Sequence, residues 1–143
     1  ISWVDSREEE FPTEIPANVT RTCTDSPEAE IVTARAGSYF LVMTHSHALD
    51  QMLCEQILRR ADFAYLGLIG SISKRRQFER RLLDRGISSA RLSQMICPIG
   101  ASAIAGKEPA TIAIAVAAEI LQRRSALACA SHSAGQPANS VAV

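Results

Sequence analysis

The chain alternates between short, fully apolar runs and longer segments with helical spacing. Residues 39–43 and residues 63–69 are continuous apolar runs that include aromatic and β-branched side chains. Such runs are typical of strands covered on both faces in a parallel sheet. After each run, apolar residues recur at three and four positions, which predicts amphipathic helices that begin near Ala48 and after Ser71.

Weaker patterns predict the rest of the chain. Proline at position 109 suits the first turn of a final helix, and Gly86 suits the end of the second helix at residue 85. The remaining predictions are a strand over residues 1–4, a short strand within residues 28–36, a short helix within residues 88–95, a loop over residues 97–106, a last helix up to residue 124, and an Ala/Ser-rich disordered tail over residues 125–143.

Alternating strands and helices with short connections predict a doubly wound, mostly parallel α/β sheet, here as one domain over residues 1–124. The strand predicted over residues 1–4 is followed by Asp5. In dinucleotide-binding folds, the second strand likewise ends at an acidic residue. We therefore expect the first strand and its glycine-rich turn to precede residue 1.

Composition narrows the class of protein. Fifteen basic and fifteen acidic residues cancel, so no overall field attracts nucleic acid or an anionic membrane. The longest apolar run, residues 112–118, is far shorter than the roughly 20 residues of a membrane-spanning helix. Four cysteines without a C-x-x-C pair favour a reducing compartment, so we expect a cytoplasmic protein.

The predicted sheet locates the candidate site. In doubly wound sheets, ligands bind beyond the carboxyl ends of the strands, where loops lead into helices. Four stretches are expected at that edge: residues 5–6, 44–47, 70–74 and 98–107.

Gly70, Ser71 and Lys74 form a strand-to-helix turn that suits an anion. Glycine allows close backbone approach, the first-turn amides are free donors, serine can cap the helix, and lysine adds positive charge. The turn therefore favours a bound phosphate. The spacing matches neither G-x-G-x-x-G nor a Walker motif, so a tight turn with a solvated lysine is an equal alternative.

Thr44, His45, Ser46 and His47 allow three interpretations. Thr44 or Ser46 could cap the next helix, a histidine could hydrogen-bond a ligand, or both histidines could hold a metal. Metal binding is the least favoured, because only Asp50 offers a further ligand. Asp50 itself suits either the helix dipole or a ligand amine.

Three further features carry weaker signals. Asp5 is placed to accept hydrogen bonds from a ribose. Cys97 reads as a buried, inert thiol in preference to a sulfur carrier. The second helix carries six basic residues, which favour a solvated face over a docking surface for nucleic acid or an acidic partner: Lys74, Arg75, Arg76, Arg80, Arg81 and Arg85.

Together these motifs resemble the C-terminal Rossmann-like domain of the xanthine dehydrogenase accessory protein family. The resemblance covers residues 2–124 and rests on five segments in this order: WVDSREEEFP, THSHALD, YLGLIGSISKRRQFERRLLDRG, CPIG and GKEPATIAIAVAAEIL. Ala105 and Thr111 depart from the glycine and glutamate that are common there. The matching positions include Thr44, His45, His47, Asp50, Gly67, Gly70, Ser71, Lys74, Pro98, Gly100, Gly106 and Lys107.

The resemblance implies a chaperone that is not itself an enzyme. Such proteins bind molybdenum cofactor, as molybdopterin or its dinucleotide, and hold it while a cysteine desulfurase supplies the sulfido ligand. They then deliver it to the apo large subunit of a molybdenum hydroxylase, and a homodimer is compatible with this role. The cofactor-binding residues expected on this basis, with no metal ligand among them, are Asp5, Thr44, His45, His47, Asp50, Gly70, Ser71, Lys74, Gly100 and Lys107.

Other functions stay open at this stage. The first alternative is an NAD(P)-dependent oxidoreductase, because fold does not choose function. A nucleic-acid or acidic-protein binding module that uses the basic helix comes second, and metal-dependent hydrolysis through the histidines comes last.

Overall fold

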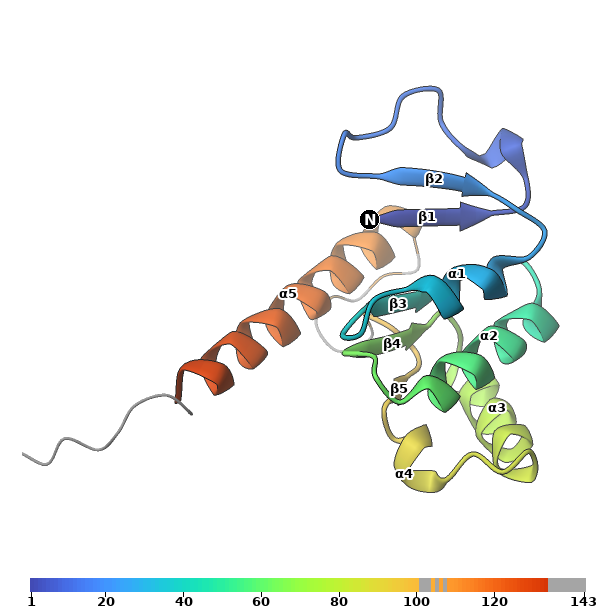
Figure 1. Ribbon diagram of the computed structural model, residues 1–143, viewed down its shortest axis with the longest axis vertical. Coiled ribbons are helices and arrows are strands. Elements are labelled where there is room, and N and C mark those ends of the chain that lie inside the picture. Colours follow the sequence, from blue (N-terminus) through green and yellow to red (C-terminus); the bar gives the residue numbers. More distant parts are fainter. Residues whose placement is uncertain (101–103, 105, 107, 134–143) are drawn as a thin grey trace, which may run out of the picture. The chain divides into compact units, whose positions relative to one another are not determined.

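A computed structural model describes residues 1–100, 104, 106 and 108–133. The chain divides into two compact units, Ile1–Pro98 and Ile99–Val143. Among the described residues, the first unit holds five strands, and the second holds one long helix. Figure 1 labels the elements of both units.

Five parallel strands form two sheets in the first unit. β1 (Ser2–Asp5) pairs with β2 (Thr20–Cys23), and the second sheet has the order β3-β4-β5. Its strands are β3 (Tyr39–Val42), β4 (Tyr65–Leu68) and β5 (Met95–Ile96). The parallel α/β fold is confirmed. One sheet was expected, but within the described residues the strands form two, because β1 and β3 are not hydrogen-bonded to each other. A strand and glycine-rich turn before residue 1 stay a prediction.

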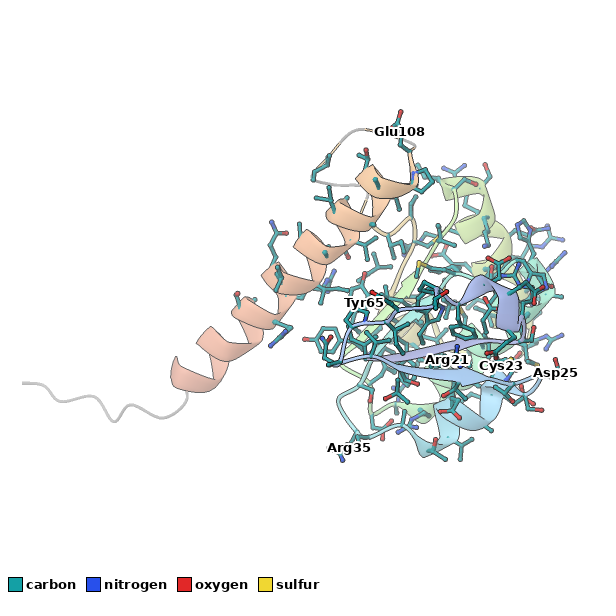
Figure 2. All side chains as sticks on the ribbon, turned by 90° about the horizontal axis from the view of Figure 1, so that it is seen from above. Arg21, Cys23, Asp25, Arg35, Tyr65 and Glu108 are labelled. Carbon is teal, nitrogen blue, oxygen red and sulfur yellow. The ribbon has the colours of Figure 1, made fainter. Side chains whose placement is uncertain are left out.

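Helices connect successive strands. A 3₁₀ helix, η1 (Glu8–Glu10), follows β1. Arg21 of β2, which Figure 2 labels, pairs with Glu8 at 3.3 Å. The predicted helices after β3 and β4 are confirmed as α2 and α3. The helices of this unit are α1 (Pro27–Thr33), α2 (His47–Arg60), α3 (Ile72–Asp84) and α4 (Ser89–Leu92).

The segment around Ile31 is a helix, so the short strand predicted within residues 28–36 is wrong. Pro27 occupies the first turn, where a proline is tolerated. The carboxylates of Glu28 and Glu30 interact favourably with the partial positive charge at the start of the helix. Arg60 of α2 then donates hydrogen bonds to the carbonyl groups of Ile31, Val32 and Ala34. These contacts satisfy carbonyls that the end of a helix leaves without partners, so a tertiary contact completes α1.

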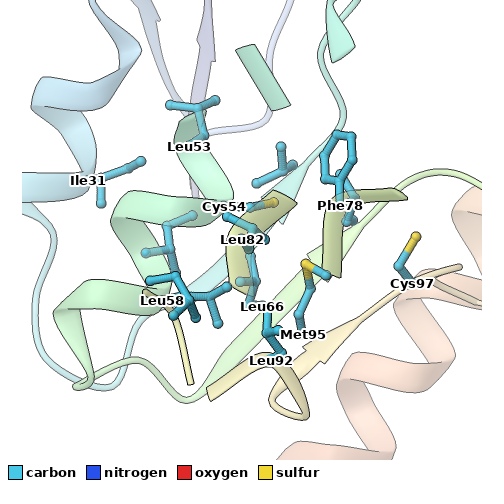
Figure 3. Close-up of a cluster of buried hydrophobic side chains, with 14 residues drawn as sticks. Ile31, Leu53, Cys54, Leu58, Leu66, Phe78, Leu82, Leu92, Met95 and Cys97 are labelled. Carbon is cyan, nitrogen blue, oxygen red and sulfur yellow. The ribbon is translucent and has the colours of Figure 1, made fainter. Parts of the chain in front are cut away.

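The core of the first unit lies between β4 and the helices α2 and α3 (Figure 3). All four residues of β4 are buried, as expected for a strand with neighbours on both edges. The side chains that are less than 2 % exposed include Cys54, Ile57 and Leu58 of α2, Leu66 and Leu68 of β4, Phe78 and Leu82 of α3, and Met95 of β5.

Glu55, in the middle of α2, forms an ion pair with Arg85, just after the end of α3. Its carboxylate accepts from Arg59 at 2.9 Å and from Arg85 at 2.8 Å, and its side chain is only 15% exposed. Burial on its own would raise the pKa of Glu55, but the hydrogen bonds from Arg59 and Arg85 outweigh burial and hold that pKa below its ordinary value of 4.5.

We expect Glu55→Gln to lower the free energy of unfolding by up to about 1 kcal/mol at neutral pH. A lowered pKa in the folded state stabilises the protein above the unfolded-state pKa, and this contribution is lost as pH falls. The difference between wild type and variant should therefore shrink below about pH 4.5 in denaturation series. Glu14→Gln is the control, because Glu14 is exposed. A difference that persists at lower pH would contradict the charge-based explanation.

The second unit contains α5 (Pro109–Ser133), which begins at the predicted proline. The helix continues beyond residue 124, so the prediction of disorder is wrong for residues 125–133. That segment is rich in alanine and serine and contains no glycine or proline to end the helix. Residues 134–143 lie outside the described residues. No helix in the described part of the chain is long and apolar enough to cross a membrane.

Candidate functional site

Two strand-to-helix loops meet at one edge of the β3-β4-β5 sheet. β3 and β4 are parallel, and Val42 lies opposite Leu68 at their carboxyl ends. The N–H of Ile69 donates to the carbonyl of Val42 at 3.0 Å. The loop at residues 43–46 therefore lies beside the loop at residues 69–71, as parallel order requires.

The first loop caps α2. The Ser46 hydroxyl accepts from the N–H of Leu49 at 3.4 Å. The Thr44 hydroxyl donates to the Ser46 carbonyl and accepts from the Ser46 N–H, at 3.0 and 3.1 Å. The capping interpretation of this motif is confirmed. His45 and His47 are exposed beside the cap, with His47 as the first residue of α2.

The second loop caps α3 in the same way. The Ser71 hydroxyl accepts from the N–H of Lys74 at 3.1 Å, which confirms the predicted cap. Gly70 immediately precedes this serine. Two helix N-termini thus begin at one sheet edge, and each presents first-turn N–H groups and a partial positive charge there.

Asp50 and Lys74 form an ion pair below these loops. The Lys74 ammonium donates to Asp50 Oδ2 at 2.6 Å and to the Ile69 carbonyl at 2.8 Å. The other oxygen, Asp50 Oδ1, accepts from the N–H of Thr44 at 3.0 Å. The Asp50 side chain is fully buried and that of Lys74 is 9% exposed. This pairing was missed in the sequence, where both side chains were expected to face a ligand.

The histidines show no metal-binding arrangement. Across residues 1–100, 104, 106 and 108–133, no three His, Cys, Asp or Glu side chains are grouped so that they could hold a metal ion. Asp50, the third ligand considered for His45 and His47, is turned inward to Lys74.

Asp5 ends β1 as predicted, but its carboxylate already has a partner. Arg7 donates to Asp5 from its backbone N–H and, through Nε and Nη2, from its guanidinium, at 3.0 to 3.1 Å. These hydrogen bonds hold the pKa of Asp5 below its ordinary value. A ribose hydroxyl would have to compete with this bidentate arginine.

Cys97 follows β5 and is buried beside α3. Its thiol approaches the Ser71 carbonyl at 3.9 Å, and Arg75 donates to the Cys97 carbonyl at 3.3 Å. Burial raises the pKa of the Cys97 thiol, although Lys74 and Arg75 oppose this shift. A thiol with a raised pKa is a poor nucleophile, which favours the inert role over a sulfur carrier.

The two remaining predicted residues belong to the second unit. The Gly100 N–H donates to Glu119 at 2.8 Å, and its φ of +67° suits glycine. Lys107 lies outside the described residues.

The basic residues of α3 and the residue that follows it are largely paired: Lys74 with Asp50, Arg75 with Glu79, Arg81 with Gln51, and Arg85, just after the helix, with Glu55.

Parallel strands joined by helices, with two capped N-termini at one sheet edge, define a Rossmann-type α/β domain. Residues 1–120 match the XdhC Rossmann domain, and the chain belongs to that family. The family predicted from the motifs is therefore confirmed. Uncharacterized protein YqeB of Escherichia coli (strain K12) is 32% identical over 96 residues, which are 65% of this chain. The aligned region spans only 16% of that relative.

Proposed function

We propose that this domain binds molybdenum cofactor, holds it during sulfuration, and supports its insertion into a xanthine dehydrogenase-type molybdenum hydroxylase. The observation that carries the proposal is the match of residues 1–120 to the XdhC Rossmann domain. In this role the domain acts as a maturation factor and not as an enzyme.

The donors at the sheet edge fit the anionic part of such a cofactor. The first turns of α2 and α3 offer backbone N–H groups, and helix N-termini favour phosphate. Gly70 precedes the cap of α3, and the exposed Ser71 still has a hydroxyl hydrogen to donate, because among the described residues it only accepts, from the N–H of Lys74. The exposed His45 and His47 supply ring nitrogens for the polar edge of a pterin. The bound cofactor would supply the molybdenum centre, and these residues would bind and orient it.

The proposal includes partners that this role requires. They are the apo large subunit of the hydroxylase and a cysteine desulfurase, and a homodimer is compatible with the role. Nucleic acid and membranes are not part of it, and the proposed location is the cytoplasm. The cofactor-binding roles expected for Asp5 from its strand end, and for Gly100 and Lys107 from the resemblance, stay predictions.

The alternative, an NAD(P)-dependent oxidoreductase, has weaker support. Such a fold uses an acidic residue at the end of a strand to accept hydrogen bonds from ribose. Here Arg7 occupies both carboxylate oxygens of Asp5.

The test is to purify the protein from a host that makes molybdenum cofactor, denature it, oxidise the extract and measure pterin fluorescence. We expect pterin with the wild type and at least about a tenfold loss in His45→Ala/His47→Ala, because removing several oriented contacts weakens binding by more than about 1.4 kcal/mol. Arg35→Ala is the control, since Arg35 is exposed on the loop before β3. A folded wild type without pterin would overturn the proposal, whereas bound NAD with hydride transfer would favour the alternative.

A further inference from the structure

We propose that Asp50 and Lys74 are a positioning pair that sets the geometry of both cofactor-facing loops, and that neither side chain contacts the cofactor. The inference rests on the proposed function for the identity of the ligand. It assigns to Lys74 a role different from the phosphate contact that its position in the motif indicates.

The first observation is that each charged group is bonded to a different loop. Asp50 lies on α2 and holds the Thr44 N–H of its own preceding loop. Lys74 lies on α3 and holds the Ile69 carbonyl of the other loop. The ion pair between Asp50 and Lys74 joins these two contacts, so one continuous chain of hydrogen bonds links the loops.

The second observation is burial. Asp50 is fully buried, and a phosphate that took Lys74 away would leave its carboxylate without a counter-charge. Removing one partner of a buried pair is strongly unfavourable. The Lys74 ammonium also lies 5.4 Å from the centre of the Phe78 ring, which gives it a further inward contact. The Lys74 ammonium therefore has its partners inside the protein and does not point toward a ligand.

The third observation explains Gly70 without a ligand. A Cβ atom at this position would lie 2.5 Å from Lys74 Cδ and 3.3 Å from Lys74 Cβ. The far end of the lysine is anchored at Asp50, so its stem cannot easily move aside. Glycine at position 70 thus provides the space in which the lysine stem passes the loop to reach Asp50.

The binding test compares Asp50→Asn with Lys74→Met, using pterin retained per folded protein. If the pair positions the loops, both variants lose pterin, each by about tenfold or more, because small displacements of binding groups are costly. If Lys74 instead contacts the phosphate, Asp50→Asn frees the ammonium and retention is unchanged or rises. That second result would overturn the inference.

Amide hydrogen exchange tests the same inference without any cofactor. We expect Lys74→Met to accelerate exchange at least about tenfold at Thr44, and Asp50→Asn to do so at residues 69–71, because each change acts across the pair. Arg81→Met is the matched control, since Arg81 also joins α3 to α2, through Gln51 at 3.1 Å. Effects confined to the loop that each altered residue itself contacts would overturn the inference. Absence of pterin from wild type, by contrast, would count against the proposed function alone.

Discussion

Lys74→Met is expected to lower the free energy of unfolding by about 3–5 kcal/mol, because it leaves a buried carboxylate without its partner. Asp50 is fully buried, and Lys74 is the cation bonded to it, at 2.6 Å. Methionine keeps most of the lysine stem, so the change removes the charge more than the packing. Denaturant unfolding followed by circular dichroism measures the effect.

Two controls separate the charge from other causes. Asp50→Asn/Lys74→Met carries neither charge, and we expect it to recover more than half of the loss, because a buried neutral amide is far less unfavourable than a buried charge. Arg59→Met breaks a pair with Glu55 in which the arginine side chain is 53% exposed, and a loss of about 0.5 kcal/mol is expected. A loss below about 1 kcal/mol in Lys74→Met would show that the pair contributes little.

The spacing of apolar residues around Asp50 and Lys74 indicates the buried pair, although both residues were interpreted as ligand groups. Asp50 stands three and four residues before Leu53 and Cys54, which are buried on α2. Lys74 stands four residues before the buried Phe78. Side chains at these spacings share one face of a helix, so both charges lie on the core-facing side. A charge on each of two core faces indicates an internal pair.

The local pattern of apolar residues was sufficient to predict the helices and strands that bury an apolar face. α2, α3 and β4 were predicted for this reason, and parallel order then brought the loops after β3 and β4 together. Because helix caps depend on neighbours close in sequence, Ser46 and Ser71 could also be predicted.

Short elements depended on distant contacts and were missed. β2 contains two threonines, an arginine and a cysteine, and β5 has two residues, so neither carries a strand pattern of its own. Their hydrogen bonds come from β1 and β4. In the same way, α1 ends against Arg60, which lies 26 residues after Ala34. The contacts that stabilise these short elements come from distant parts of the chain, so the local sequence does not predict them.

Phe78→Ala is expected to lower the free energy of unfolding by about 3–5 kcal/mol, because it removes a large side chain from the core and leaves a cavity. The Phe78 side chain is 0% exposed and belongs to the cluster between α2, β4 and α3. It also lies beside Lys74, so its loss removes a contact of the buried ammonium. Chemical denaturation with a shared slope for both proteins measures the difference.

Leu83→Ala is the matched control on the same helix. Leu83 is 49% exposed, so we expect a loss of no more than about 0.5 kcal/mol. Comparable losses in the two variants would contradict the burial that distinguishes the two faces of α3. A large loss in Phe78→Ala alone would support that orientation, and the same orientation directs Lys74, one turn earlier, toward Asp50.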